Sequence, residues 1–188
     1  LRDSELEEML NEKYLTEGEN LYADLIREID ELKEAGGHLG VDSGYTIKTD
    51  TERILSIERY IVNTVASSST ELRYDTIDKE LKIILTLPEL FKDESYVERI
   101  SENIKSQMLK QMKEDENIMY WLAREDEELF VEEFSSISPE ENFYINEHNK
   151  LVIVFDKYEV APGYMGNPEF EIPTEILTDI LTNGEYLK

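Results

Sequence analysis

The chain has no cysteine and only two histidines among its 188 residues. Without cysteine there are no disulfides, no thiolate nucleophiles and no cysteine-bound metal centres. His38 and His148 are far apart in the sequence, and neither has a partner at the spacing of a zinc site. We therefore expect no metal centre and no cofactor, although the many carboxylates leave a loosely held calcium ion open.

Apolar runs long enough to cross a membrane are also missing. None approaches the ~18 to 20 residues that a membrane helix needs, and Leu1 does not begin a signal peptide. We expect this stretch to be soluble. Because the first residue is not Met, we also expect any targeting or membrane segment to lie outside it.

Positive charge is scarce. The chain carries 44 acidic and 19 basic side chains, a formal net charge of -25. Such a charge repels nucleic acid and anionic lipid, because both are bound through Lys and Arg. The 11 Tyr, 6 Phe and 1 Trp supply more aromatic area than disordered chains carry, so we expect a folded domain. Two interpretations of the charge stay open: a basic partner, or only a well-solvated surface.

Hydrophobic periodicity predicts an α+β fold, in which helices pack on antiparallel sheet elements. Residues 1–35 form an amphipathic helix with Leu21, Leu25, Ile29 and Leu32 on one face, which ends at Gly36–Gly37. Four strands follow within residues 45–87 as an antiparallel meander. Pro88 begins a helical turn, and a long helix presents an apolar stripe made of Val97, Ile100, Ile104, Met108 and Met112.

The second half of the chain predicts a helix at 125–134, a hairpin and a closing helix. The hairpin joins "NFYIN" to "KLVIVFDKY", and the closing helix begins at Pro173 and ends at Gly184. We divide the chain into an N-terminal helical segment (1–40), a first α+β half (41–115) and a second half (116–188).

The motifs of common enzymes are absent. The stretch "VASSST" (65–70) has three serines but no Gly-x-Ser-x-Gly elbow, and no phosphate-binding glycine loop occurs. Carboxylate pairs such as Glu127–Glu128 arise without any catalytic need in so acidic a chain. We predict that the domain is not an enzyme and has no catalytic residues.

One loop, "YEVAPGYMGNPEF" (158–170), follows an unbroken apolar strand. Pro162 and Pro168 fix two φ angles, while Gly163 and Gly166 permit turns that other residues resist. Tyr164 and Met165 are then expected at the tip. Such side chains suit an interface, but they could equally fold back as a lid on the sheet.

Two segments carry a resemblance to a known family. "LKIILTLPELFKDESYVERISENIKSQM" (81–108) and "NFYINEHNKLVIVFDKYEVAPGYMGNPEFEIPTEIL" (142–177) resemble the extracytoplasmic region of RsiV-type anti-sigma factors. The second segment is the more specific, since Tyr158, Pro162, Gly166, Phe170 and Pro173 keep its spacing. The same segments also occur in PdaC-type peptidoglycan deacetylases.

The resemblance implies an extracellular sensor domain on a single-pass membrane protein. In that family the outer domain binds and inhibits C-type lysozyme, and binding exposes the protein to signal peptidase and an intramembrane protease. Their cleavage releases an extracytoplasmic-function sigma factor. The implied lysozyme contacts are Pro162, Gly163 and Tyr164 with the neighbouring Met165, and Ser67, Ser68 and Ser69 in a loop where the family has glycines and a histidine.

The alternative is a non-catalytic, cell-wall-binding domain beside a peptidoglycan deacetylase. The catalytic part of such an enzyme needs an Asp and a His-x-x-x-His metal site, as the resemblance implies. Two isolated histidines cannot supply that site, so this chain would be the neighbour of the catalytic domain.

Overall fold

A computed structural model describes residues 4–34, 40–64, 68–122 and 132–188. The first helix, α1, spans Ser4–Glu34, close to the predicted 1–35. Its buried anchors are Leu6 and Leu10, which lie against Leu55, Ile57 and Ile77 of the first sheet. Leu21, Leu25 and Ile29 of the predicted apolar face are only half-buried. The helix is therefore held mainly through its first half.

The first sheet is the predicted antiparallel meander, with strand order β1-β2-β3-β4. Its strands are β1 (Gly40–Asp50), β2 (Ile54–Thr64), β3 (Ser68–Asp78) and the short β4 (Ile83–Leu85). The buried carboxylate of Asp78 accepts the backbone N–H groups of Glu80 and Leu81, which forms the turn into β4. The pattern of alternating Ile, Val, Thr and Tyr that predicted these strands is confirmed.

The second sheet has the order β5-β6-β7, all antiparallel. β5 (Asn142–Ile145) and β6 (Leu151–Val154) are the predicted hairpin, and β7 is Glu169–Ile172. Before this sheet come a 3-10 turn at Pro88–Leu90 and the long helix α2, Ser95–Glu114. Both were predicted, whereas β7 was not, because its four residues have only two buried positions, while β6 is an unbroken apolar run.

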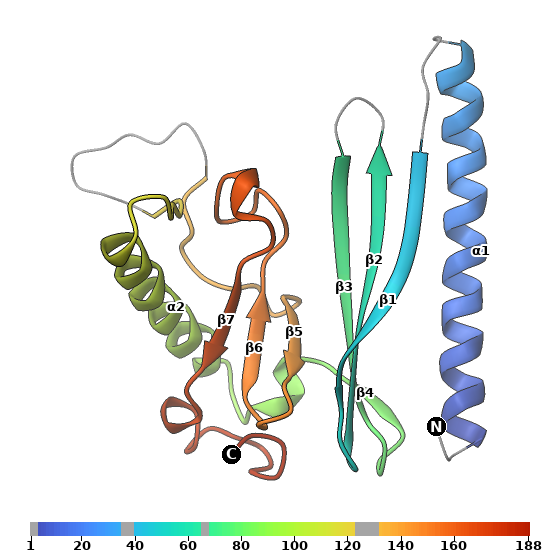
Figure 1. Ribbon diagram of the computed structural model, residues 1–188. Coiled ribbons are helices and arrows are strands. Elements are labelled where there is room, and N and C mark those ends of the chain that lie inside the picture. The colour runs from blue at the N-terminus through green and yellow to red at the C-terminus, as the bar shows by residue number, and fades with distance from the viewer. Residues whose placement is uncertain (1–3, 35–39, 65–67, 123–131) are drawn as a thin grey trace.

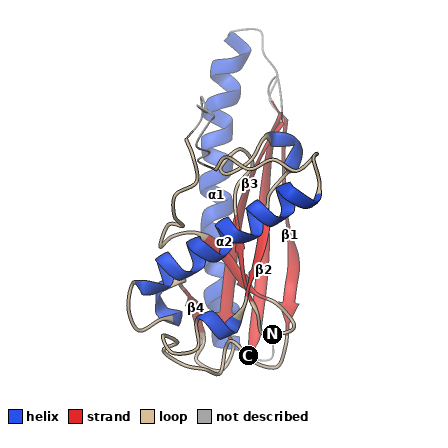
Figure 2. Cartoon of the chain, turned by 90° about the vertical axis from the view of Figure 1, so that its left-hand side faces the viewer, coloured by secondary structure: helices blue, strands red, loops and turns tan. Residues whose placement is uncertain are grey.

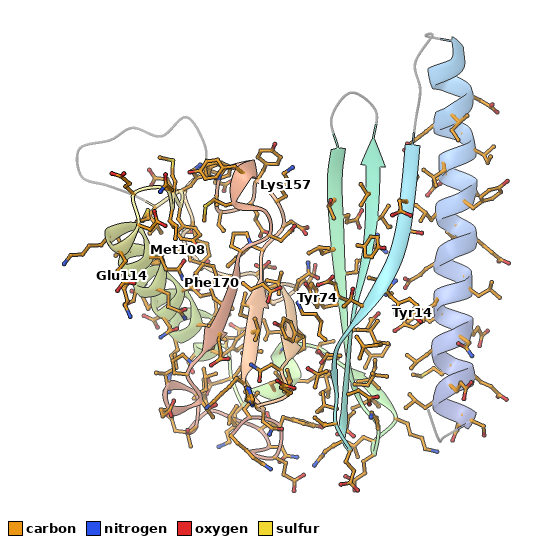
Figure 3. All side chains as sticks on the ribbon, in the orientation of Figure 1. Tyr14, Tyr74, Met108, Glu114, Lys157 and Phe170 are labelled. Atoms are coloured by element: carbon orange, nitrogen blue, oxygen red, sulfur yellow. The ribbon has the colours of Figure 1, made fainter. Side chains whose placement is uncertain are left out.

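The elements stack in four layers: α1, the first sheet, the second sheet and α2 (Figure 1). Figure 2 shows α2 crossing in front of the strands. The largest core lies between the second sheet and α2 and includes Met108 of α2 and Phe170 of β7, both labelled in Figure 3. Between the sheets, Tyr74 stacks on Tyr144 with ring centroids 5.6 Å apart. The α+β class with antiparallel sheets is thus confirmed, and the division at residues 40 and 115 stays a prediction.

Two predicted helices need correction. Beyond Pro173 the chain forms only a 3-10 turn at Thr174–Ile176, and then tight turns. Leu181 forms an antiparallel bridge with Phe91, and the Ile180 carbonyl accepts the N–H of Lys92, so these backbone groups bond outside any helix. Of the predicted helix 125–134, residues 125–131 lie outside the described part of the chain. Residues 132–134 are not helical, since the Phe134 N–H is bonded to the Trp121 carbonyl.

Candidate partner-binding surface

The candidate loop, residues 156–168, leaves and re-enters the second sheet at neighbouring points. Val154 at the end of β6 pairs with Glu169 at the start of β7. Next to this pair, the Phe155 N–H donates to the Pro168 carbonyl at 3.0 Å, and Asn167 Nδ2 donates to the Phe155 carbonyl at 3.2 Å. Both ends of the loop are therefore fixed to a buried sheet.

The middle of the loop is also anchored. Val160 and Ala161 are buried, and the Val160 carbonyl accepts the N–H of Trp121 at 2.8 Å. Pro162 then leads into a 3-10 turn, Gly163–Met165, in which the Met165 N–H donates to the Pro162 carbonyl at 2.9 Å. The loop therefore has backbone hydrogen bonds at its middle as well as at its ends.

Gly163 and Gly166 of this turn are constrained to glycine by different features of the structure. Gly166 has φ 69° and ψ −134°, a conformation that costs any residue with a Cβ. Gly163 lies against the ring of Tyr158, and a Cβ built at Gly163 would be 2.2 Å from that ring's Cζ. The sequence predicted freedom of φ at both positions. It did not predict the close approach of an aromatic ring.

Tyr164 is 68 % exposed. Its hydroxyl donates to the Asn117 carbonyl at 3.2 Å, which holds the side chain in one orientation while the ring faces solvent. Met165 is half-buried and packs against the main core. The two residues expected together at the tip therefore point in different directions. Tyr164 faces solvent, and Met165 packs against the core under the loop.

The serine-containing hairpin is placed differently from the prediction. Ser68 and Ser69 belong to β3, where their backbones pair with Thr64 and Asn63 of β2. Ser67 lies outside the described residues. Residues 68–70, predicted as part of a loop at 65–70, thus belong to a strand, because regular pairing with β2 begins at Ser68.

The paired ends of β2 and β3, at Thr64 and Ser68, lie at the same end of the molecule as the candidate loop 156–168, called the tyrosine loop from here on; this is the upper end in Figure 1. One contact joins the strand below the serines to the second sheet next to the loop. The Leu72 carbonyl accepts Nδ2 of Asn142, the residue of β5 that pairs with Val154 of β6, at 3.2 Å. The start of α1 and the C-terminus lie at the opposite end (Figure 1).

Three carboxyl groups crowd the base of the loop. Burial, and then the neighbouring charge of Glu159, raise the pKa of Glu141 to about 7. Burial is also the main cause that raises the pKa of Glu159 and of Asp156. Two backbone N–H groups, of Ser138 and Asp156, donate to Glu141 and Glu159 respectively. Around neutral pH, the Glu141 carboxyl keeps its proton in part of the molecules.

The described ranges were also compared with the geometry of a metal site. Across these ranges, no three side chains of the His, Cys, Asp or Glu type are grouped so that they could hold a metal ion. His148 lies in the β5–β6 turn, with a side chain 74 % exposed and Nε2 3.7 Å from a Glu147 oxygen. His38 is outside the described residues.

The sequence analysis did not predict that Asn117 and Tyr158 contribute to this surface. Asn117 provides the carbonyl that orients Tyr164, from a turn that no sequence motif connects with the loop. Tyr158 is 60 % exposed and has φ 71°, which is unusual for an aromatic residue. The tyrosine itself was visible in the sequence, but a left-handed backbone at a non-glycine position gives no sequence signal.

Part of the chain matches a known protein family. Residues 88–175, which comprise α2, the second sheet and the tyrosine loop, match the family described as "Protein of unknown function (DUF3298)". Two solved structures share the fold. A DUF3298 family protein from Pseudomonas aeruginosa PAO1 has a TM-score of 0.61 at 13% identity, over 80% of this chain and 65% of that one. A DUF3298 family member from Bacteroides fragilis NCTC 9343 has 0.60 at 16% identity, over 97% and 71%.

A particular relative is more informative. All 188 residues align at 51% identity with the anti-sigma-V factor RsiV of Bacillus subtilis strain 168. The chain spans 64% of the length of that relative. It therefore contains a DUF3298 domain and is homologous along its whole length to an RsiV-type anti-sigma factor, which confirms the resemblance found in its sequence. Within the described part of the chain, neither helix is long and apolar enough to cross a membrane.

Proposed function

We propose that this chain is the outer, sensing domain of a membrane-bound anti-sigma factor, and that it binds and inhibits C-type lysozyme. Binding makes the full-length protein a substrate for signal peptidase and an intramembrane protease. Their cleavage releases an extracytoplasmic-function sigma factor held by a cytoplasmic segment. The domain works by binding and not by catalysis.

The observation that carries the proposal is the presentation of Tyr164. Its ring is 68 % exposed, yet its loop is fixed at both ends and its hydroxyl is hydrogen-bonded. A preorganised aromatic side chain binds with a small loss of conformational entropy. It therefore suits insertion into a cleft, and a protein that fills the lysozyme cleft also excludes the polysaccharide.

The charge supports the same partner. A net charge of -25 attracts a strongly basic protein at long range and increases the association rate. C-type lysozymes are basic proteins with a sugar-binding cleft. Homology to an anti-sigma factor supports the regulatory role, and the tyrosine loop supports the choice of ligand.

The proposal is tested by mixing the purified domain with a C-type lysozyme on a sizing column at low ionic strength. We expect one peak of about one-to-one stoichiometry, and loss of lysozyme activity on cell walls as the domain is added. Separate elution with full lysozyme activity would refute the proposal. Retention of the free domain on insoluble peptidoglycan would favour a cell-wall-binding role instead.

A further inference from the structure

Tyr158 has a backbone conformation that its residue type disfavours. Its φ is 71°, and the N–H of Glu159 bonds to the Asp156 carbonyl at 3.0 Å. Tyr158 is thus the third residue of a four-residue turn. A positive φ at that position is normally supplied by Gly or Asn, which adopt it at little cost. The turn itself does not call for tyrosine.

The core does not call for tyrosine either. The Tyr158 side chain is 60 % exposed, and Tyr158 is not among the residues of the buried clusters. Lys157 Nζ lies 5.2 Å from the centroid of its ring. A strained backbone that presents an exposed aromatic ring is typical of a functional position, where the strain is retained for what the side chain contacts.

The ring is directed at the candidate loop. Its Cζ would lie 2.2 Å from a Cβ at Gly163, so the ring occupies the space beside that glycine. Gly163 immediately precedes Tyr164, which is 68 % exposed. Gly163 thus lies between the ring of Tyr158 and residue Tyr164. Both tyrosines expose aromatic surface beside the Gly163–Met165 turn.

We propose that Tyr158 and Tyr164 together form a two-tyrosine surface, and that Tyr158 contacts the protein partner directly. This inference rests on the proposed function, because the partner is the same basic protein with a cleft. It extends the interface to a residue six positions before Tyr164. Gly163 is required because the ring of Tyr158 lies where any side chain at 163 would project.

The test compares lysozyme binding and thermal stability for Tyr158→Gly, Tyr158→Asn and Tyr158→Phe. Gly and Asn keep the turn, so their melting temperatures should stay within about 3 °C of the wild type. Their affinity for lysozyme should fall about tenfold, since an aromatic contact is lost. Tyr158→Phe keeps the ring and should bind within about threefold of the wild type. Tyr22→Ala is the matched control, because Tyr22 is 67 % exposed on α1, and it should leave the affinity unchanged.

A double-mutant cycle separates direct contact from positioning. If Tyr158 contacts the partner, Tyr158→Gly weakens binding in the Tyr164→Ala background as well, measured at low ionic strength where affinity is highest. An effect that disappears in that background would show that Tyr158 acts only by positioning Tyr164, and would overturn the inference. Unchanged affinity of Tyr158→Gly would overturn it too. Both results leave the proposed function intact, which fails only if the wild-type domain does not bind lysozyme.

Discussion

Tyr164 combines high exposure with a fixed orientation. Its ring contributes little to the core, so Tyr164→Ala removes one exposed hydrogen bond and almost no buried area. We expect the variant to bind lysozyme about 2 kcal/mol more weakly, the typical loss when a central aromatic anchor is removed. Its free energy of unfolding should stay within about 0.5 kcal/mol of the wild-type value. Calorimetric titration and a thermal melt measure the two effects. Unchanged affinity with a lowered melting temperature would mean that the ring has a structural role.

Glu141 makes stability depend on pH in a defined direction. Its folded-state pKa, raised to about 7, exceeds its ordinary value of 4.5. Between these values the folded protein holds a proton that the unfolded chain has lost, so the free energy of unfolding falls as pH rises from 4.5 to 7. Because Glu141 is only half-buried, solvent screening reduces the effect.

The variant Glu141→Gln removes this titration. Relative to the wild type it should gain roughly 1 to 2 kcal/mol at pH 8 and about nothing at pH 4.5. Urea unfolding at the two pH values measures the difference. An equal gain at both would show that ionisation of Glu141 is not its source.

At the scale of elements, the tyrosine loop depends on the conformation of Gly166. A Cβ there would contact nothing within 4 Å, so the cost of Gly166→Ala comes from the backbone alone. With φ 69° and ψ −134° we expect a loss of about 1 to 3 kcal/mol, or a rearranged loop with weaker lysozyme binding. Gly184→Ala, also free of contacts within 4 Å and without a positive φ, is the matched control. Equal urea midpoints for the two variants would contradict this account of the turn.

The long periodic elements were predictable, whereas β7 and the turns near the C-terminus were not. The apolar stripe of α2 and the alternation in β1–β3 extend over several turns or strand repeats, so local pattern and tertiary packing agree. Near the C-terminus Leu177, Ile180 and Leu181 are buried and spaced like a helix face. There the bridge between Leu181 and Phe91 provides the hydrogen bonds instead, a long-range contact that local spacing cannot reveal.

Some features of the tyrosine loop were likewise predictable from the sequence, and others were not. Proline fixes φ and glycine permits a positive φ, so a turn within residues 162–168 was predictable from the sequence. Which side chain faces outward depends on contacts from distant segments. The Asn117 carbonyl holds Tyr164, and the core takes Met165. The left-handed Tyr158 depends on the turn around it, which the sequence does not specify.

At the scale of the whole molecule, charge governs how fast a partner arrives. With a net charge of -25, we expect the association rate with lysozyme to fall about tenfold or more between 50 mM and 500 mM salt, as screening shortens the range of attraction. The dissociation rate should change much less, since contacts at the loop are short-range. Stopped-flow or surface-based kinetics give both rates. An association rate indifferent to salt would contradict electrostatic steering.

The central claim is that the tyrosine loop enters the sugar-binding cleft of lysozyme. A calorimetric titration of the wild-type domain into lysozyme, with and without a saturating cell-wall oligosaccharide in the cleft, tests it most directly. If the loop and the sugar occupy the same space, the oligosaccharide should raise the domain's apparent Kd by a factor of one plus the ratio of the free sugar concentration to the sugar's own Kd. Equal affinity for empty and sugar-filled lysozyme would place the interface elsewhere and contradict the account.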